Sequence, residues 1–434
     1  MDIRTEARKM KEQAPILAAT TVEERNAALA AIAVALEQHK EEIFAANQAD
    51  MAAADQNLVS PAVKKRLKFN EDKLKDVIAG IHQLISLPDP LGKELLHREL
   101  DAGLELYRVS VPIGVIGVIF EARPDALVQI SSLCLKSGNC ALLKGGKETR
   151  NTNRVLFRVI HDTAVASGLP ENCLVQAELH NEIDELLSCD KDVDLLIPRG
   201  SNAFVQYIMN NTKIPVMGHA DGICHIYVDK DADYKKALPI LIDAKTQYTA
   251  ACNAVETILV DRAIAADFLP QMKAAMAAAG VRLRGTAEAM EILADAVISA
   301  VEAEDIMTED DFRTEYLDLI ASVRLVDDVK EAVAHINAYG SHHTDSILSE
   351  NPETVEYFMQ MVDSAGVYQN CSTRFADGFR YGFGAEVGIS TSKLHARGPV
   401  GLEGLVTYKY KLYGTGQIVG DYASGKSQFH FKDL

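Results

Sequence analysis

The segment 245-KTQYTAACNAVETILVD-261 contains Cys252, the residue of this chain best suited to covalent catalysis. Small and polar residues precede the cysteine and an apolar run follows it, so we expect a loop that leads into a strand. A substrate can reach a thiol in such a loop, and the backbone N–H groups of Cys252 and Asn253 could bind an oxyanion. The same local pattern also fits an inert loop cysteine, and both readings stay open at this point.

The remaining thiols and histidines offer weaker candidates for chemistry. Six further cysteines lie in apolar elements, at a helix end or in a polar loop: Cys134, Cys140, Cys173, Cys189, Cys224 and Cys371. The sequence contains no C-x-x-C pair, so it does not predict a zinc site. Adjacent His342 and His343 cannot both face one point on a regular element, so we expect surface or pocket histidines and no metal. His225 alternates with apolar residues, which indicates a core histidine.

Candidate binding groups follow four predicted strand ends, in 120-FEARPD-125, 144-KGGKE-148, 197-IPRGSN-202 and 217-MGHADGICH-225. Glycines let a backbone approach a ligand closely, and lysines can meet ribose or phosphate. The usual G-x-G-x-x-G loop of dinucleotide-binding sheets is missing. Taken alone, 144-KGGKE-148 also fits an ordinary turn with solvated lysines. The prediction of a binding site therefore rests on the shared position of the four stretches at strand ends.

The elements that position these groups alternate between strands and helices. A capping box of Thr21 and Glu24 begins a helix over 21–54, and a second helix covers 71–86. Asp125 is expected to cap a helix over 126–137. The other predicted strands cover 104–111, 114–120, 140–144, 173–176, 193–197, 214–217, 256–260 and 319–326. The other predicted helices cover 149–166, 181–188, 201–210, 234–244, 263–278 and 329–337. This alternation predicts an α/β fold with doubly wound parallel sheets, which bind ligands at the carboxyl ends of their strands.

Charge and composition limit the possible partners. The net charge of −18 argues against nucleic acid and against an anionic membrane surface. No apolar run approaches the roughly 20 residues that cross a bilayer. The N-terminal residues carry charges of both signs and no signal-peptide core, so we expect a cytoplasmic protein.

Six long stretches together resemble a known family. They are 111-VPIGVIGVIFEARPDA-126, 138-GNCALLKGGKE-148, 217-MGHADGICHIYVD-229, 314-TEYLDLI-320, 335-HINAYGSHHTDSI-347 and 381-YGFGAEVGISTSKLHARGPVGLEGL-405. In this order they closely resemble the gamma-glutamyl phosphate reductase family of the aldehyde dehydrogenase superfamily. The resemblance implies an NADP-binding domain over 1–229, interrupted by an oligomerisation hairpin at about 98–113 and completed by about 361–404. It also implies a catalytic domain over 230–360 and a C-terminal oligomerisation strand within 405–434.

The resemblance also implies a reaction in proline biosynthesis. The family uses NADPH to reduce gamma-glutamyl phosphate to glutamate gamma-semialdehyde with release of phosphate. Cys252 falls where the superfamily carries its catalytic thiol, which attacks the acyl phosphate and forms a thioester. A small-molecule substrate and a homo-oligomer are implied, and glutamate 5-kinase is a possible partner. The alternatives are a hydrolytic aldehyde dehydrogenase and a catalytically silent protein of the same fold.

Two departures from the superfamily pattern favour the reductase reading. The stretch 217-MGHADGIC-224 has Gly and His where hydrolytic relatives carry a Glu that activates water. Arg123 stands where relatives have an oxyanion-hole Asn, and a guanidinium can bind a phosphate with two hydrogen bonds.

Residue roles are carried over position by position. Lys147 stands where NAD-preferring relatives have an acidic residue, which favours NADP(H) over NAD(H). The remaining cofactor-site candidates are Lys144, Gly145, Gly146, Arg199, Ser201, Asn202 and Glu315, the last at the nicotinamide-side ribose. Asn370 and Arg374 are the candidates for the amino-acid end of the substrate.

Overall fold

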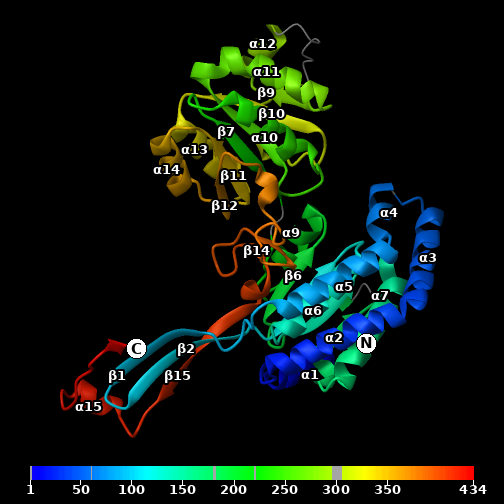
Figure 1. Cartoon of the computed structure of the whole chain (residues 1–434), viewed down its shortest axis with the longest axis vertical. Coiled ribbons are helices and arrows are strands. Elements are labelled where there is room, and N and C mark those ends of the chain that lie inside the picture. The colour runs from blue at the N-terminus through cyan, green and yellow to red at the C-terminus, as the bar shows by residue number, and fades with distance from the viewer. Residues whose placement is uncertain (1, 60, 179–181, 219–220, 296–304) are drawn as a thin grey trace. The chain divides into compact units, whose positions relative to one another are not determined.

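The computed structural model describes residues 2–59, 61–178, 182–218, 221–295 and 305–434 (Figure 1). The chain forms two compact units. The first comprises Met1–Gly218, Phe383–Gly388 and Val400–Leu434, and the second comprises His219–Gly382 and Ile389–Pro399.

The boundary between the units differs from the expected one. Strand β7 (Cys224–Val228) pairs with β8 (Val255–Asp261) and β11 (Thr344–Leu348), and β12 (Gly366–Gln369) pairs with β11. The hydrogen-bonded partners of a strand decide which sheet it joins. The first unit therefore ends at Gly218 and not at 229. Of the expected 361–404 segment, all of 361–382 and also Ile389–Pro399 belong to the second unit.

A four-stranded parallel sheet forms the centre of the first unit. Its order is β5 (Leu174–Ala177), β4 (Cys140–Gly145), β3 (Val115–Phe120) and β6 (Leu195–Arg199). The apolar strand residues are almost all buried, as expected for a sheet covered on both faces. The connecting helices are α6 (Pro124–Lys136), α7 (Arg150–Ala166), α8 (Glu182–Leu187) and α9 (Asn202–Asn211). The strand predicted over 214–217 is reduced to one bridge, between Leu196 and Val216.

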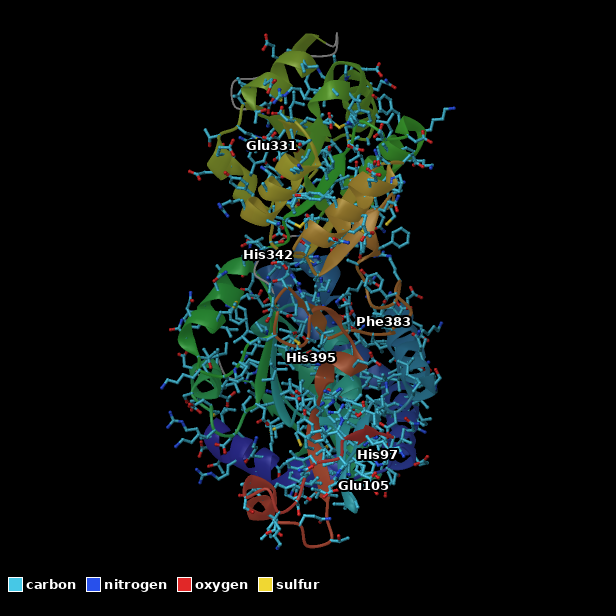
Figure 2. The ribbon with its side chains drawn as sticks, turned by 90° about the vertical axis from the view of Figure 1, so that its left-hand side faces the viewer. His97, Glu105, Glu331, His342, Phe383 and His395 are labelled. Carbon is cyan, nitrogen blue, oxygen red and sulfur yellow. The ribbon has the colours of Figure 1, made fainter. Side chains whose placement is uncertain are left out.

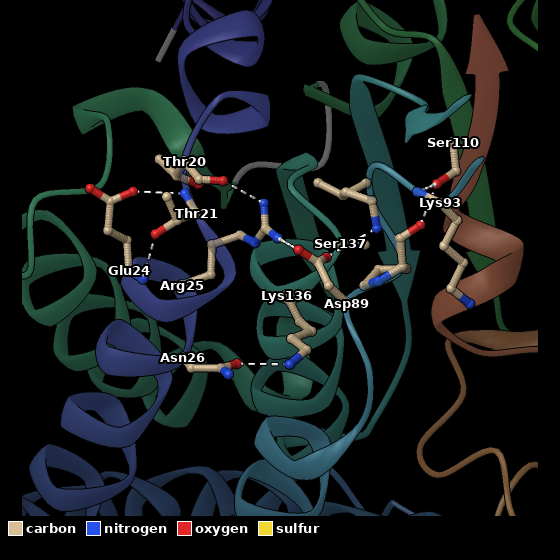
Figure 3. A network of polar contacts seen from close by, with 12 residues as sticks. Thr20, Thr21, Glu24, Arg25, Asn26, Asp89, Lys93, Ser110, Lys136 and Ser137 are labelled. Atoms are coloured by element: carbon tan, nitrogen blue, oxygen red, sulfur yellow. Dashed lines mark hydrogen bonds and ion pairs between the residues drawn. The ribbon is translucent and has the colours of Figure 1, made fainter. Parts of the chain in front are cut away.

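The N-terminal helices of this unit are α1 (Ile3–Ala18), α2 (Val22–Gln38), α3 (Lys40–Gln56), α4 (Pro61–Leu67) and α5 (Glu71–Ser86). A buried polar network fastens α2 to its neighbours (Figure 3). The Arg25 guanidinium lies 2.7 Å from an Asp89 carboxylate oxygen, and the Lys136 ammonium donates to the Asn26 side chain at 2.8 Å. Burial lowers the pKa of Lys136, and the charge of Arg25 lowers it further, while the charge of Asp89 acts to raise it.

A second, antiparallel sheet completes the first unit. Its order is β15 (Val406–Tyr413), β2 (Leu104–Pro112), β1 (Glu94–Asp101) and β16 (Lys432–Asp433), with the short α15 (Val419–Ala423) between β15 and β16. The expected hairpin at 98–113 corresponds to β1 and β2, and the expected C-terminal strand is β15. His97 and Glu105, labelled in Figure 2, join the hairpin strands through a 3.0 Å contact.

A six-stranded parallel sheet forms the second unit. Its order is β12, β11, β7, β8, β10 (Ile320–Val326) and β9 (Arg282–Gly285). Its helices are α10 (Tyr234–Thr246), α11 (Ala265–Ala278), α12 (Ala287–Asp295), α13 (Val329–Tyr339) and α14 (Pro352–Met361). Successive residues of β7 point to opposite faces of the sheet. Ile226 and Val228 belong to one hydrophobic core cluster and Tyr227 belongs to another, so both faces are covered. The short strands β13 (Gly388–Ser390) and β14 (Gly398–Val400) pair with each other.

The core of the second unit contains a histidine with a strong pH response. His335 is buried against Phe312, Tyr339 and His225, and neither ring nitrogen has a hydrogen-bond partner among the described residues. Burial lowers its pKa to about 2. Below about pH 6.5, His335 is protonated in the unfolded chain but stays neutral in the folded protein. The free energy of unfolding therefore falls as the pH drops below about 6.5.

Replacing His335 with phenylalanine is expected to remove this acid sensitivity. At pH 5 the histidine costs about 2 kcal/mol of stability relative to neutral pH, because roughly 1.4 kcal/mol is lost for each pH unit below 6.5. Thermal melting at pH 5 and pH 7.5 checks this. The exposed His82→Phe variant is the control, and an equal loss in both variants contradicts the assignment.

Candidate active site

Cys252 lies in the loop between α10 and β8 and is half-buried. Burial raises the pKa of the six other thiols, to about 12 for Cys134 and Cys173 and about 11 for Cys189. Since the thiolate is the nucleophile, those six cysteines are poorly suited to attack a substrate. The geometry therefore favours Cys252.

The thiol has a histidine partner. His343 Nε2 lies 3.2 Å from Cys252 Sγ, and its Nδ1 lies 2.9 Å from Thr344 Oγ1. The imidazole is buried and held from its far side, so it is oriented to exchange a proton with the sulfur. The neighbouring His342 points elsewhere, with Nδ1 2.6 Å from the Asp363 carbonyl oxygen. The two adjacent histidines thus face different points, as expected, but the pairing of His343 with the thiol was not predicted.

The strands bring these residues together at their amino ends. Cys252 precedes β8 and His343 precedes β11, and both strands flank β7 in the sheet. Gly222, just before β7, lies against the backbone of Cys252: a Cβ on it would fall 2.1 Å from the Cys252 carbonyl oxygen. Any side chain at 222 would therefore displace the nucleophile loop. The candidate catalytic pair of this unit therefore lies at the amino ends of its strands, whereas the sequence predicts ligand binding at the carboxyl ends.

The backbone beside the thiol offers donors for an oxyanion. Within the described residues, the N–H groups of Cys252 and Asn253 make no hydrogen bond. The Asn253 side chain donates to the Ala376 carbonyl at 2.8 Å, and the Thr373 hydroxyl donates to the Asn253 carbonyl at 2.7 Å. The Asn253 side chain and carbonyl group thus hold the loop in place, while the backbone N–H groups of Cys252 and Asn253 are available to a bound anion.

Arg374 is a buried cation near the thiol. It lies in the 3₁₀ helix Thr373–Phe375 and is 8% exposed. Its Nε donates to Gln247 Oε1 at 2.9 Å, and its guanidinium lies over the Tyr248 ring. Burial lowers the pKa of Arg374, Arg380 lowers it further, and Cys252 raises it. No carboxylate of the described residues is within ion-pair distance, so the terminal guanidinium nitrogens can bind a substrate anion.

Asn370 has a different place from the one expected. Its side chain accepts from the Ser349 backbone N–H and donates to the Ser349 carbonyl and to Glu350. The amide is occupied in fixing the loop after β11, and its backbone has a positive φ of 50°. These contacts give Asn370 a structural role, and its contact with the amino-acid end of the substrate stays a prediction.

The carboxyl edge of the first unit carries the expected cofactor residues. Lys144 is nearly buried, and among the described residues its ammonium donates only to the Gly145 carbonyl, at 2.7 Å. Burial lowers the pKa of Lys144. Lys147 is exposed, and Arg123 is half-buried at the start of α6; neither side chain has a polar partner among the described residues. These cations fit the ribose and phosphate groups of a dinucleotide.

Two glutamates that the sequence analysis did not single out connect the loops at this edge. Glu148 accepts from the Ala122 N–H at 2.7 Å, and Glu121 accepts from the Ser201 N–H at 3.1 Å. The glycines make room for these contacts: a Cβ on Gly146 would fall 2.1 Å from Glu148, and one on Gly145 2.2 Å from Asn153. Their lack of side chains therefore serves internal packing, beyond the expected approach of a ligand.

The remaining expected residues lie on two different edges. Arg199 ends β6, Ser201 precedes α9 and Asn202 begins it. They lie beside the point between the parallel strands β3 and β6 where the strand order reverses, which is where such sheets bind ligands. Glu315 is half-buried in the second unit, and its charge raises the pKa of the nearby Lys245 and Glu256. Among the expected strand-end residues, His219 lies outside the described part of the chain.

Comparison with known proteins identifies the family of this chain. The model of the aldehyde dehydrogenase family matches residues 1–309. The chain therefore belongs to the aldehyde dehydrogenase family. It is 56% identical over 434 residues to the gamma-glutamyl phosphate reductase of Pelotomaculum thermopropionicum, covering 100% of this chain and 98% of the relative. Within the family, the chain belongs to the gamma-glutamyl phosphate reductases.

Solved structures give the same result. The crystal structure of gamma-glutamyl phosphate reductase from Thermotoga maritima is 38% identical, with a TM-score of 0.92 over 96% of this chain and 100% of that chain. An engineered glycolyl-CoA reductase with bound NADP+ is 16% identical, with a TM-score of 0.65 over 95% of this chain and 96% of that chain, and shares the fold. No described helix is long and apolar enough to cross a membrane.

Proposed function

We propose that this oxidoreductase uses NADPH to reduce L-glutamyl 5-phosphate to L-glutamate 5-semialdehyde, with release of phosphate, in proline biosynthesis. The observation that carries the proposal is the Cys252–His343 pair, with unoccupied backbone amides beside it, in a chain whose full-length relatives bear this reductase name.

The residues act in a fixed order. His343 takes the proton of the Cys252 thiol, and the sulfur attacks the acyl carbon. The N–H groups of Cys252 and Asn253 stabilise the negative oxygen, phosphate leaves, and a thioester remains on Cys252. NADPH, when bound, supplies the hydride that reduces the thioester. Collapse of the resulting thiohemiacetal releases the aldehyde, and His343 returns the proton to the sulfur.

NADP(H) is the proposed cofactor, with Lys144 and Lys147 as its ribose and 2′-phosphate contacts. The remaining proposed contacts are Gly145, Gly146, Arg199, Ser201, Asn202 and Glu315, and Arg123 is the proposed phosphate contact. The bound NADP+ of the engineered glycolyl-CoA reductase supports this choice by fold analogy.

Changing Lys147 to glutamate is expected to shift the preference toward NADH. The substitution replaces an attractive partner of the 2′-phosphate with a repulsive one, which costs about 2 kcal/mol or roughly 30-fold in affinity. Fluorescence titration with NADPH and NADH gives both dissociation constants without turnover. The exposed Lys191→Glu variant is the control. An unchanged ratio of the two constants places the 2′-phosphate contact elsewhere.

Arg374 is the proposed contact for the α-carboxylate of the substrate. An Arg374→Gln variant is expected to raise KM for glutamate semialdehyde about 10- to 100-fold, because a charged hydrogen bond contributes about 1.5–3 kcal/mol. The KM for phosphate and kcat/KM for butyraldehyde, which lacks a carboxylate, should change less than about twofold. A raised phosphate KM instead assigns Arg374 to the phosphate group.

The proposed assembly is a homo-oligomer, with glutamate 5-kinase as a possible functional partner in the cytoplasm. The sheet of β15, β2, β1 and β16 exposes large apolar side chains that a second copy could cover. They are Tyr408, Tyr410, Leu412 and Tyr413 of β15, together with Phe431, which directly precedes β16; each is at least half exposed.

The function is tested in the reverse direction, with glutamate semialdehyde and NADP+. Reduction of NADP+ is expected to require phosphate. An equal rate without phosphate would identify a hydrolytic aldehyde dehydrogenase. No turnover, no thermal shift with NADPH and no preferential labelling of Cys252 would identify a catalytically silent protein.

A further inference from the structure

A buried ion pair joins the two ends of the nucleophile loop. Lys245 lies in the last turn of α10 and Glu256 is the second residue of β8, so Cys252 lies in the segment between them. The Lys245 ammonium is 2.7 Å from Glu256 Oε2, and both side chains are 0% exposed. The pair therefore fixes the separation of the two elements from which the loop emerges.

The pair is costly to keep in the core. Removing two charges from water costs several kcal/mol per ion, and apolar side chains of similar size are often equally stable or more so. The cost shows in both partners: burial lowers the pKa of Lys245 and raises that of Glu256 to about 7. Among the described residues, Glu256 Oε1 has no partner at normal hydrogen-bond geometry, although the nearby Tyr316 backbone N–H acts to lower the pKa of Glu256. Stability alone therefore does not explain the pair.

A third segment contacts the pair. The Lys245 ammonium lies 5.9 Å from the centre of the Tyr316 ring, whose hydroxyl lies 2.9 Å from Ser322 Oγ on β10. The charges of Glu315 and Asp318 act on Lys245 from the same segment. Lys245 and Glu256 thus connect the loop of the nucleophile to the segment that carries Glu315, the proposed ribose contact.

We propose that Lys245 and Glu256 are positioning residues. They hold Cys252 within reach of His343 and fix the position of the nucleophile loop relative to the segment that carries Glu315. This inference rests on the proposed function, because it takes Cys252 as the nucleophile. The pair sets the reactivity of the thiol and makes no contact with the substrate.

The test replaces both residues, as Lys245→Met/Glu256→Leu. The Tm is expected to stay within about 5 °C of the wild type, because the ion pair is close to neutral in stability. The rate of Cys252 alkylation by iodoacetamide and kcat should both fall at least about tenfold, since small misplacement of a reacting group is costly. The KM for phosphate should change less than about twofold. A merely structural pair would change the Tm and leave kcat and the alkylation rate unaltered.

Two further variants make the result decisive. Glu256→Gln keeps the size of the side chain and is measured in the same way, so the inference stays testable if the double variant does not fold. Arg25→Met/Asp89→Asn removes a partly buried ion pair of the first unit and is the control, with wild-type alkylation expected. Wild-type kcat and alkylation in both pair variants overturn the inference. Full activity of a Cys252→Ser variant would instead overturn the proposed function.

Discussion

Replacing Cys252 with serine is expected to lower reductase activity by roughly 10³- to 10⁶-fold, the range found when a nucleophile is removed. A serine hydroxyl holds its proton far more tightly than a thiol, so His343 cannot activate it to the same extent. The affinity for NADPH should change less than about twofold, because the substitution removes no proposed cofactor contact. Rapid-quench assays of acyl-phosphate reduction and fluorescence titration with NADPH measure the two effects.

The control for this variant is Cys371→Ser. Cys371 is also half-buried, and burial raises the pKa of its thiol. Its replacement should leave kcat within about twofold of the wild type. Full residual activity of Cys252→Ser would refute the nucleophile assignment, whatever the control shows.

Local patterns predicted much of the fold. The helix at 71–86 matches α5, since its apolar positions, its cap and the prolines that follow it are all close in sequence. The helix predicted over 21–54 is divided at His39 into α2 and α3, and no glycine or proline marks that break. Asp125 is not the cap of α6: Arg123 occupies that position, and Pro124 begins the helix, where its missing N–H costs nothing.

The sequence predicts only those residues of the candidate site that stand in recognisable local motifs. The sequence predicts Cys252 and Arg374 as candidate site residues. The two lie near each other in the structure, since the charge of Cys252 raises the pKa of Arg374 and the Thr373 hydroxyl, next to Arg374, donates to the carbonyl of Asn253. For His343 the sequence predicts only a surface or pocket position. Its pairing with Cys252 leaves no local pattern, because the two residues are 91 positions apart. Only the placement of β11 and β8 on either side of β7 brings the two together, and no local pattern records that topology.

Replacing His343 with glutamine is expected to have the second-largest effect. Glutamine has nearly the size of histidine and can keep a hydrogen bond to Thr344, but it cannot take a proton from Cys252. Since a positioned general base contributes about 10²- to 10⁴-fold, kcat should fall by about that factor. The rate of Cys252 alkylation at neutral pH should fall with it, because the thiolate is the species that reacts.

The adjacent histidine provides a matched control. His342 is one residue away but contacts the Asp363 carbonyl and not the thiol, so His342→Gln should keep kcat within about threefold of the wild type. A purely structural role for His343 would lower the Tm and leave alkylation of the folded protein unchanged. Equal effects of the two variants on kcat would contradict a proton-transfer role. A large loss in His343→Gln alone, in both turnover and alkylation, is the result that the 3.2 Å contact between Nε2 and Sγ predicts.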